Sequence, residues 1–132
     1  MTKYLLDTNV IVDLLRGVSS GVQNKLLACG IDYCAISDIT LYELYCGAQM
    51  SRNVEYNMQL ISNLAHQIEI LPVSDAYQMA AEEKVRLKTR GEIIDDIDLL
   101  IACSAKCSGR ILVTNNLRHM SRIPELEIED WR

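Results

Sequence analysis

Three carboxylates occupy positions where the surrounding pattern calls for apolar residues. Asp7 ends a short apolar stretch, and Glu43 and Asp98 have mostly apolar or small neighbours at the spacings that share one helix face. Burying a carboxylate without a partner costs several kcal/mol. Three that converge also repel one another unless a cation lies among them. We therefore expect Asp7, Glu43 and Asp98 to be partly buried around a metal ion.

The type of ligand predicts the metal. Oxygen ligands with no histidine or thiolate among them favour Mg²⁺, or Mn²⁺, over zinc. Such an ion lowers the pKa of a bound water and neutralises charge on a phosphoryl group during transfer. An acidic cluster of this kind is typical of metal-assisted phosphodiester cleavage.

Local roles compete with this hypothesis. Asp7 could simply cap the helix that follows it, and Asp95 could cap a later helix with Asp98 in its first turn. Glu43 has no capping role in the middle of a helix, so its alternative is a solvated helix edge. Asp96 is either part of a cap or a supporting ligand.

Neutral polar residues stand beside these acids. Asn9 follows Asp7, and Thr114 and Asn116 follow an apolar stretch that could lie beside the first strand. Their oxygens could hold a metal-bound water or a substrate phosphate. The alternative for Asn9 is a helix cap, and for residues 114–116 an ordinary turn.

These residues need an α/β fold to bring them together. Strands are predicted at residues 4–6, 33–36, 68–73 and 111–113, with a weaker fifth at 126–128. Helices are predicted from about residue 8 to Gly17 and at 20–29, 39–50, 53–66, 75–90 and 95–107. Such alternation predicts one domain over residues 1–132, with a parallel sheet of four to five strands and helices on both faces. In such sheets the functional crevice lies beyond the carboxyl ends of the strands.

The amino-acid composition limits the cellular compartment and the class of protein to which the chain can belong. The 132 residues are 49% hydrophobic with a net charge of −5, which argues against a protein that coats nucleic acid. No apolar run approaches the roughly 20 residues that cross a bilayer, and the first residues do not form a signal peptide. Five cysteines without a C-x-x-C pair are expected to be buried free thiols. We expect a cytoplasmic protein without a membrane segment.

Several stretches, in this order, resemble PIN-domain ribonucleases, specifically the VapC-type toxins of bacterial toxin–antitoxin pairs. They are LDTN at 6–9, ITLYELYCGA at 39–48, DLLIA at 98–102 and LVTNN at 112–116, followed by RHM at 118–120, IP at 123–124 and EDW at 129–131. The similarity extends over nearly the whole chain. It departs at Asn116, where many members have Asp, and at Met120, where members typically have Phe.

The resemblance implies a Mg²⁺-dependent endoribonuclease. In the mechanism that it implies, Asp7 and Asp98 hold the metal, and Glu43 is a further ligand or orients the attacking water as a general base. Asn116 would orient the water shell of the metal, with Asp96 in support. Lys84, Arg86, Lys88 and Arg90 either form a solvated helix face or contact the RNA backbone.

The resemblance also implies partners. Similar proteins often cut structured RNA such as transfer RNA, and a VapB-type antitoxin holds them inactive with its C-terminal segment along the groove. A homodimer and a toxin–antitoxin hetero-oligomer are expected.

Other classes fit less well. A receiver-like domain needs a lysine at the end of a late strand, and none follows Val113. A haloacid-dehalogenase-type phosphatase needs a second Asp where Asn9 stands, and the glycine-rich nucleotide-binding motifs are absent. A PIN-like module that binds RNA or protein without cutting remains the alternative, because Asn116 replaces an acid.

Overall fold

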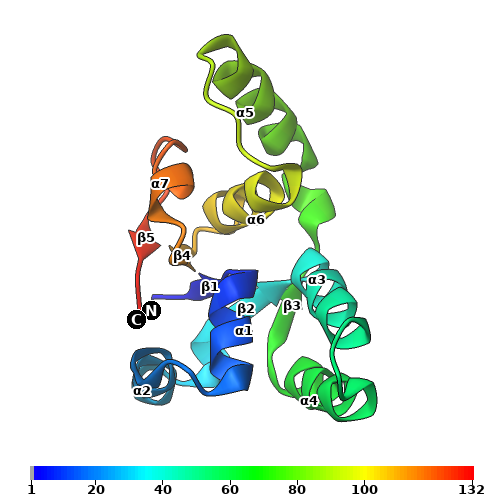
Figure 1. Cartoon of the computed structure of the whole chain (residues 1–132). Coiled ribbons are helices and arrows are strands. Elements are labelled where there is room, and N and C mark those ends of the chain that lie inside the picture. The colour runs from blue at the N-terminus through cyan, green and yellow to red at the C-terminus, as the bar shows by residue number, and fades with distance from the viewer. Residues whose placement is uncertain (1) are drawn as a thin grey trace.

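The first strand of the chain lies at the centre of the sheet (Figure 1). This is a computed structural model that describes residues 2–132, and its five parallel strands pair in the order β3-β2-β1-β4-β5. Their bounds are β1 Tyr4–Leu6, β2 Cys34–Ser37, β3 Glu69–Leu71, β4 Ile111–Val113 and β5 Ile128–Glu129. The predicted α/β fold and parallel sheet are confirmed, and β4 pairs with β1 as expected.

Helices connect the strands. Their bounds are α1 Thr8–Arg16, α2 Ser20–Cys29, α3 Asp38–Gln49, α4 Val54–Gln67, α5 Tyr77–Thr89, α6 Asp96–Cys107 and α7 Leu117–Met120, with 3₁₀ turns at Ile31–Tyr33 and Val73–Ala76. Six of these follow the predicted ranges closely. The short α7 and the two 3₁₀ turns were not predicted.

The third strand is shorter than predicted. It ends at Leu71, because Pro72 has no N–H to donate to a neighbouring strand. The 3₁₀ turn that follows delays the start of α5 to Tyr77, two residues after the predicted start.

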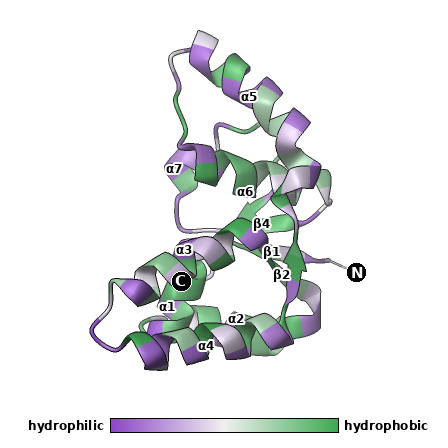
Figure 2. Cartoon of the chain, turned by 90° about the vertical axis from the view of Figure 1, so that its right-hand side faces the viewer, coloured by the Kyte–Doolittle hydropathy of each residue, from purple (hydrophilic) through white to green (hydrophobic). Residues whose placement is uncertain are grey.

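The sheet is covered on both faces, as predicted. Leu5 is buried in a cluster with residues of α5, α6 and α7, whereas its neighbour Leu6 is buried with residues of α1 to α4. Alternate residues of one strand therefore serve two cores. Figure 2 shows that α6 and β4 are largely hydrophobic, whereas hydrophilic and hydrophobic residues alternate along α5.

The carboxyl ends of the strands lead directly into polar groups. The Asp7 N–H donates to the Val113 carbonyl at 2.9 Å, which ties the end of β1 to the end of β4. Ser37, at the end of β2, caps α3 by accepting from the Ile39 N–H at 3.2 Å. The residues after β1, β2 and β4 thus lie along one edge of the sheet.

The cysteines are free thiols, as predicted, but their burial differs from the prediction. Cys34 and Cys103 are buried, Cys29 and Cys46 are half-buried, and Cys107 is exposed because it ends α6 at the surface. Within residues 2–132, no helix combines the length and the apolar character needed to cross a bilayer.

Candidate active site

Asp7 is a buried carboxylate surrounded by neutral donors. It is 3% exposed, its Oδ1 accepts from the Thr8 N–H at 2.8 Å, and its Oδ2 accepts from the Thr114 hydroxyl at 2.8 Å. Burial raises its pKa, and these two hydrogen bonds offset part of that shift. None of the ion pairs among residues 2–132 includes Asp7. Asp7 does cap α1, yet this role leaves its charge uncompensated.

Thr8, the residue directly after Asp7, links Glu43 to the end of β1. The Thr8 hydroxyl donates to Glu43 Oε1 at 2.6 Å and lies 3.0 Å from the hydroxyl of the buried Thr40. Glu43 is half-buried, so the predicted alternative of a solvated helix edge does not describe it. The hydroxyls of α1 and α3 therefore fix one carboxylate oxygen and leave the other free to bind a ligand.

Asp98 completes the cluster from the first turn of α6. Its pKa is raised to about 6, first by burial and then by the negative charges of Asp7, Asp95 and Glu43. Asp98 on α6 is therefore exposed to the charges of Asp7, which follows β1, and of Glu43 on α3. Asp95 caps α6 by accepting from the Ile97 N–H at 3.1 Å, as its alternative role predicted.

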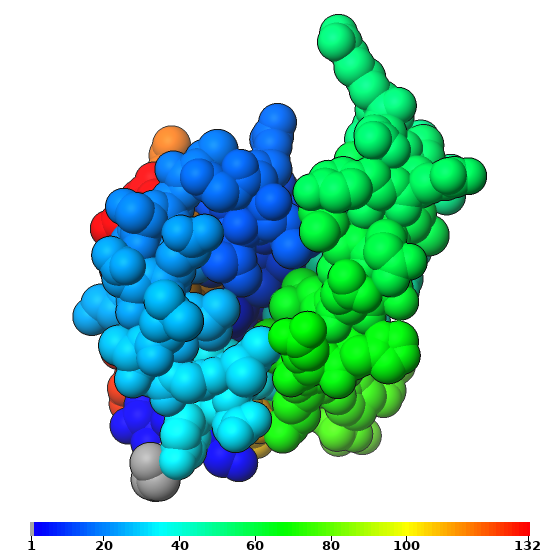
Figure 3. All heavy atoms as spheres, turned by 90° about the horizontal axis from the view of Figure 1, so that it is seen from below, coloured from blue at the N-terminus to red at the C-terminus, as the bar shows by residue number. Residues whose placement is uncertain are grey.

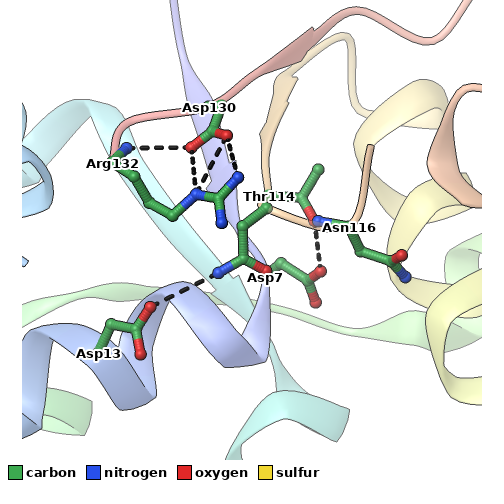
Figure 4. Close-up of polar contacts among 7 residues, drawn as sticks. Asp7, Asp13, Thr114, Asn116, Asp130 and Arg132 are labelled. Carbon is green, nitrogen blue, oxygen red and sulfur yellow. Dashed lines mark hydrogen bonds and ion pairs between the residues drawn. The ribbon is translucent and has the colours of Figure 1, made fainter. Parts of the chain in front are cut away.

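Thr114 and Asn116 follow the end of β4, and Figure 4 shows the hydrogen bond between Thr114 and Asp7. Thr114 is fully buried, donates its hydroxyl to Asp7 and accepts the backbone N–H of Asn116 at 3.0 Å. The Asn116 Nδ2 lies 3.5 Å from Asp98 Oδ2. Both residues therefore contact the acids, in contrast to an ordinary turn. Figure 4 also shows Arg132 bound to Asp130 rather than to Asp7.

Two predicted supporting residues do not join this cluster. The Asp96 carboxylate is 67% exposed and pairs with Lys84 at 2.7 Å, because the first position of α6 directs it away from Asp98. Asn9 is exposed on α1, and its helix is capped by Asp7 instead. The geometry therefore does not favour Asp96 as a supporting residue of the metal site.

The four predicted basic residues, three on α5 and one at its C-cap, differ in their surroundings. Arg86 pairs with Glu83 at 2.8 Å and donates to the Arg122 carbonyl at 2.9 Å, so its half-buried side chain ties α5 to the segment after α7. Lys84 pairs with Asp96, and Arg90 lies 4.0 Å from Glu92, although both remain largely exposed. These internal partners do not favour Arg86 as an RNA contact, which stays a prediction.

The carboxylates and neutral polar groups at this site suit a hard divalent cation that keeps several of its water ligands. No group of three or more His, Cys, Asp or Glu side chains within residues 2–132 is placed to hold a metal ion. The charge of Asp7 nevertheless acts on Asp98, and the side chains that hydrogen-bond to these two carboxylates are the neutral Thr114 and Asn116. Mg²⁺ binds through one or two carboxylates and keeps several waters, so this arrangement suits it.

A groove leads away from Glu43. It has a volume of about 450 Å³ and is lined by residues of α1, α3 and α4, with Val12, Leu44 and Ile61 among its apolar residues and Arg16 as its cation. Seen from below in Figure 3, α1 and α4 stand on either side of a hollow. One end of this groove is therefore part of the acidic cluster.

The sequence pattern missed several contributors to the site. Thr8 and Thr40 bind the acids through hydroxyls, and their signal was the threonine directly after Asp7 and three residues before Glu43. His119 contacts Asn116 at 2.9 Å, and its signal was a histidine one helical turn after Asn116.

Comparison with known proteins gives consistent results. The model of the PIN domain family matches residues 4–126. The chain is 32% identical over 132 residues to "Ribonuclease VapC2" of Haemophilus influenzae and to "tRNA(fMet)-specific endonuclease VapC" of Salmonella typhimurium, covering 99% of each chain in both cases.

Solved structures show the same likeness. The chain superposes on a chain of the DNA-bound VapBC complex of Salmonella typhimurium with a TM-score of 0.92 and 31% identity, covering all of both chains. For VapBC2 of Rickettsia felis, bound to a DNA fragment from the promoter, the TM-score is 0.88 and the identity 33%, over 99% of this chain and 100% of the other.

Proposed function

Because the chain belongs to the VapC-type ribonucleases of the PIN-domain family, we propose that it cleaves RNA with Mg²⁺ at the cluster of Asp7, Glu43 and Asp98. The observation that carries this proposal is the burial of Asp7 with only neutral donors around it. A carboxylate in that setting is costly to keep ionised unless a cation joins it. The alternative cation, Mn²⁺, prefers the same oxygen ligands.

The chain's own residues divide the work. Asp7 and Asp98 are the carboxylates that would hold the metal, which supplies charge neutralisation at the scissile phosphate when bound. Thr114 fixes the rotamer of Asp7 through its hydroxyl. Glu43 is anchored by Thr8 through one oxygen, and its second oxygen accepts a proton from the attacking water as a general base.

The substrate and partners follow from the relatives. We propose a structured RNA, such as a transfer RNA, because a relative is named as a tRNA(fMet)-specific endonuclease. A VapB-type antitoxin is the proposed partner, since the similar structures are VapBC complexes, and the groove beside Glu43 is its proposed site. We further propose a homodimer within a cytoplasmic toxin–antitoxin complex, with residues 1–132 acting as one domain.

We propose that Lys84, Lys88 and Arg90, the exposed basic residues of α5 and its C-cap, contact the RNA. Lys88 makes no ion pair within residues 2–132, and Lys84 and Arg90 are paired at the surface, where salt and phosphate can compete. These three side chains therefore offer positive charge near the end of α5.

Two aspartates of α6 give a matched test. Asp98→Asn removes a charge from the cluster, whereas Asp96→Asn removes a charge two residues away that faces solvent. With purified protein free of antitoxin, we expect cleavage of total RNA in Mg²⁺, loss in EDTA and recovery on adding Mg²⁺ or Mn²⁺. Asp98→Asn should lower the cleavage rate by at least about 100-fold, and Asp96→Asn by less than about threefold.

Other outcomes would redirect the proposal. Equal losses in the two variants would remove Asp98 from the site. RNA binding without cleavage by the wild-type protein, measured with the same RNA, would favour the PIN-like binding module instead.

A further inference from the structure

Asn116 stands at the start of α7 but does not cap it. An asparagine at this position normally accepts a backbone N–H from the first turn of the helix. Here the side chain makes no such bond. Its Oδ1 instead lies 2.9 Å from Nδ1 of His119, the third residue of α7. The imidazole of His119 thus takes the place of the backbone donor.

The carboxylate of Asp98 determines which way the Asn116 amide faces. Its Nδ2 lies 3.5 Å from Asp98 Oδ2 and can only donate, which suits a carboxylate. With the NH₂ turned to Asp98, Oδ1 must accept from His119, so the proton of the neutral imidazole is on Nδ1. The reversed amide would point its oxygen at Asp98 and repel it.

Asn116 is also tied to Asp7 through its backbone. Its N–H donates to the Thr114 hydroxyl, and that hydroxyl donates to Asp7 Oδ2. One residue thus connects to two carboxylates of the cluster, by its backbone to Asp7 and by its side chain to Asp98. His119 is itself half-buried and precedes Met120, whose side chain is fully buried and fixes α7 on the core.

We propose that His119 is a positioning residue that holds the amide of Asn116 towards Asp98. This inference rests on the proposed ribonuclease function. An acid at position 116 would add a further negative charge to three that already repel one another. An oriented amide instead supplies a donor to Asp98 without adding charge, and His119 keeps that donor from rotating away.

A set of variants tests this role through kinetics. His119→Ala should lower kcat by about 10-fold or more, the range typical of residues that orient a site from behind, with KM changed less than about twofold. His119→Asn restores an N–H near the Nδ1 position and should recover most of the rate. In an Asn116→Ala background, His119→Ala should have almost no additional effect, because its only route to Asp98 is gone.

The other histidine is the matched control. His66 is exposed on α4, where its Nδ1 contacts the Ser62 carbonyl, so His66→Ala should leave kcat unchanged. Fully additive losses in His119→Ala and Asn116→Ala, or no rescue by His119→Asn in a folded variant, would overturn the proposal.

A second measurement needs neither activity nor metal. Nitrogen-15 NMR of the wild-type protein in EDTA should show the neutral His119 imidazole with its proton on Nδ1, and His119→Ala or His119→Asn should shift the side-chain amide of Asn116. A proton on Nε2 would overturn the proposal, even if His119→Ala fails to fold. If the wild-type protein cuts no RNA, the ribonuclease proposal fails separately, whereas the tautomer still decides the contact.

Discussion

Each end of the sheet buries one charged side chain, and the two are treated differently. At the amino end, Arg110 is 8% exposed and pairs with Glu69, while also donating to the Tyr4 carbonyl at 3.3 Å. At the carboxyl end, Asp7 is 3% exposed and meets only a backbone N–H and a hydroxyl. Among residues 2–132, the buried arginine has an ion-pair partner and the buried aspartate has none.

This difference separates a structural charge from a functional one. A buried charge that is paired contributes to folding when its geometry is good and weakens folding when its partner is removed. A buried carboxylate that only neutral groups solvate lowers stability unless a cation joins it. The two ends of the sheet therefore predict opposite responses to mutation.

Asp7→Asn should produce the largest change. We expect the RNA cleavage rate to fall by at least about 100-fold, because the most buried carboxylate of the metal site is lost. The free energy of unfolding in EDTA should stay the same or rise, since burial of the charged form is what raises the pKa of Asp7. Cleavage assays and urea titrations measure both. A large loss of stability with normal cleavage would reverse the comparison.

Arg110→Met should lower the stability of the protein and leave RNA cleavage unchanged. The loss of charged hydrogen bonds to Glu69 and Tyr4 should lower the free energy of unfolding by about 1.5–3 kcal/mol. The cleavage rate of the folded variant should match that of the wild-type protein, because Arg110 lies at the opposite end of the sheet. Reduced kcat at a temperature where the variant is fully folded would contradict this expectation.

Without metal, the free energy of unfolding should depend on pH, because the carboxylates of the cluster are costly to keep charged. Asp98 has a folded pKa of about 6, above its ordinary value of 3.8, so between those values the folded state binds more protons than the unfolded state. Stability should therefore decrease as pH rises through this window, and the full penalty should remain above pH 6. Because Asp98 is half-exposed, we expect only about 1 kcal/mol. Urea titrations in EDTA should show a shallower decrease for Asp98→Asn than for the wild-type protein.

The smallest effect concerns the basic residues of α5. Lys88→Ala should weaken RNA binding by about two- to threefold and reduce the slope of the salt dependence by about one, without changing stability. Arg86→Ala should lower stability, because it loses Glu83 and the Arg122 carbonyl, and leave RNA binding unchanged. The opposite pattern would restore Arg86 as the RNA contact.

The sequence was sufficient to predict most of the fold. Short apolar runs alternating with helices gave the strands, and the positive φ of Gly17 explains why α1 ends where the glycine suggested. The three acids were predictable because each interrupts an apolar pattern. That reasoning detects side chains that enter the core, which is where Asp7 lies.

Other features depend on tertiary contacts. Asp96 and Asp98 differ by two positions on one helix, and only their packing sends one to Lys84 and the other to the cluster. Arg86 looked like part of an exposed basic run, yet a carbonyl 36 residues away binds it. The role of His119 could not be predicted from the sequence. It depends on the Asn116 side chain not capping α7, which only the three-dimensional structure reveals.

The pairing of β1 with β4 has a consequence for synthesis of the chain. Asp7 is made early, but its N–H is held by Val113 and its carboxylate by Thr114, more than 100 residues later. Asp98 and Asn116 also come from the last third of the chain. Because proteins are made from the amino end, the acidic cluster cannot form until β4 has been made and has docked on β1. Ribosome-bound chains that end before Val113 therefore lack the hydrogen bonds that hold Asp7 in the cluster.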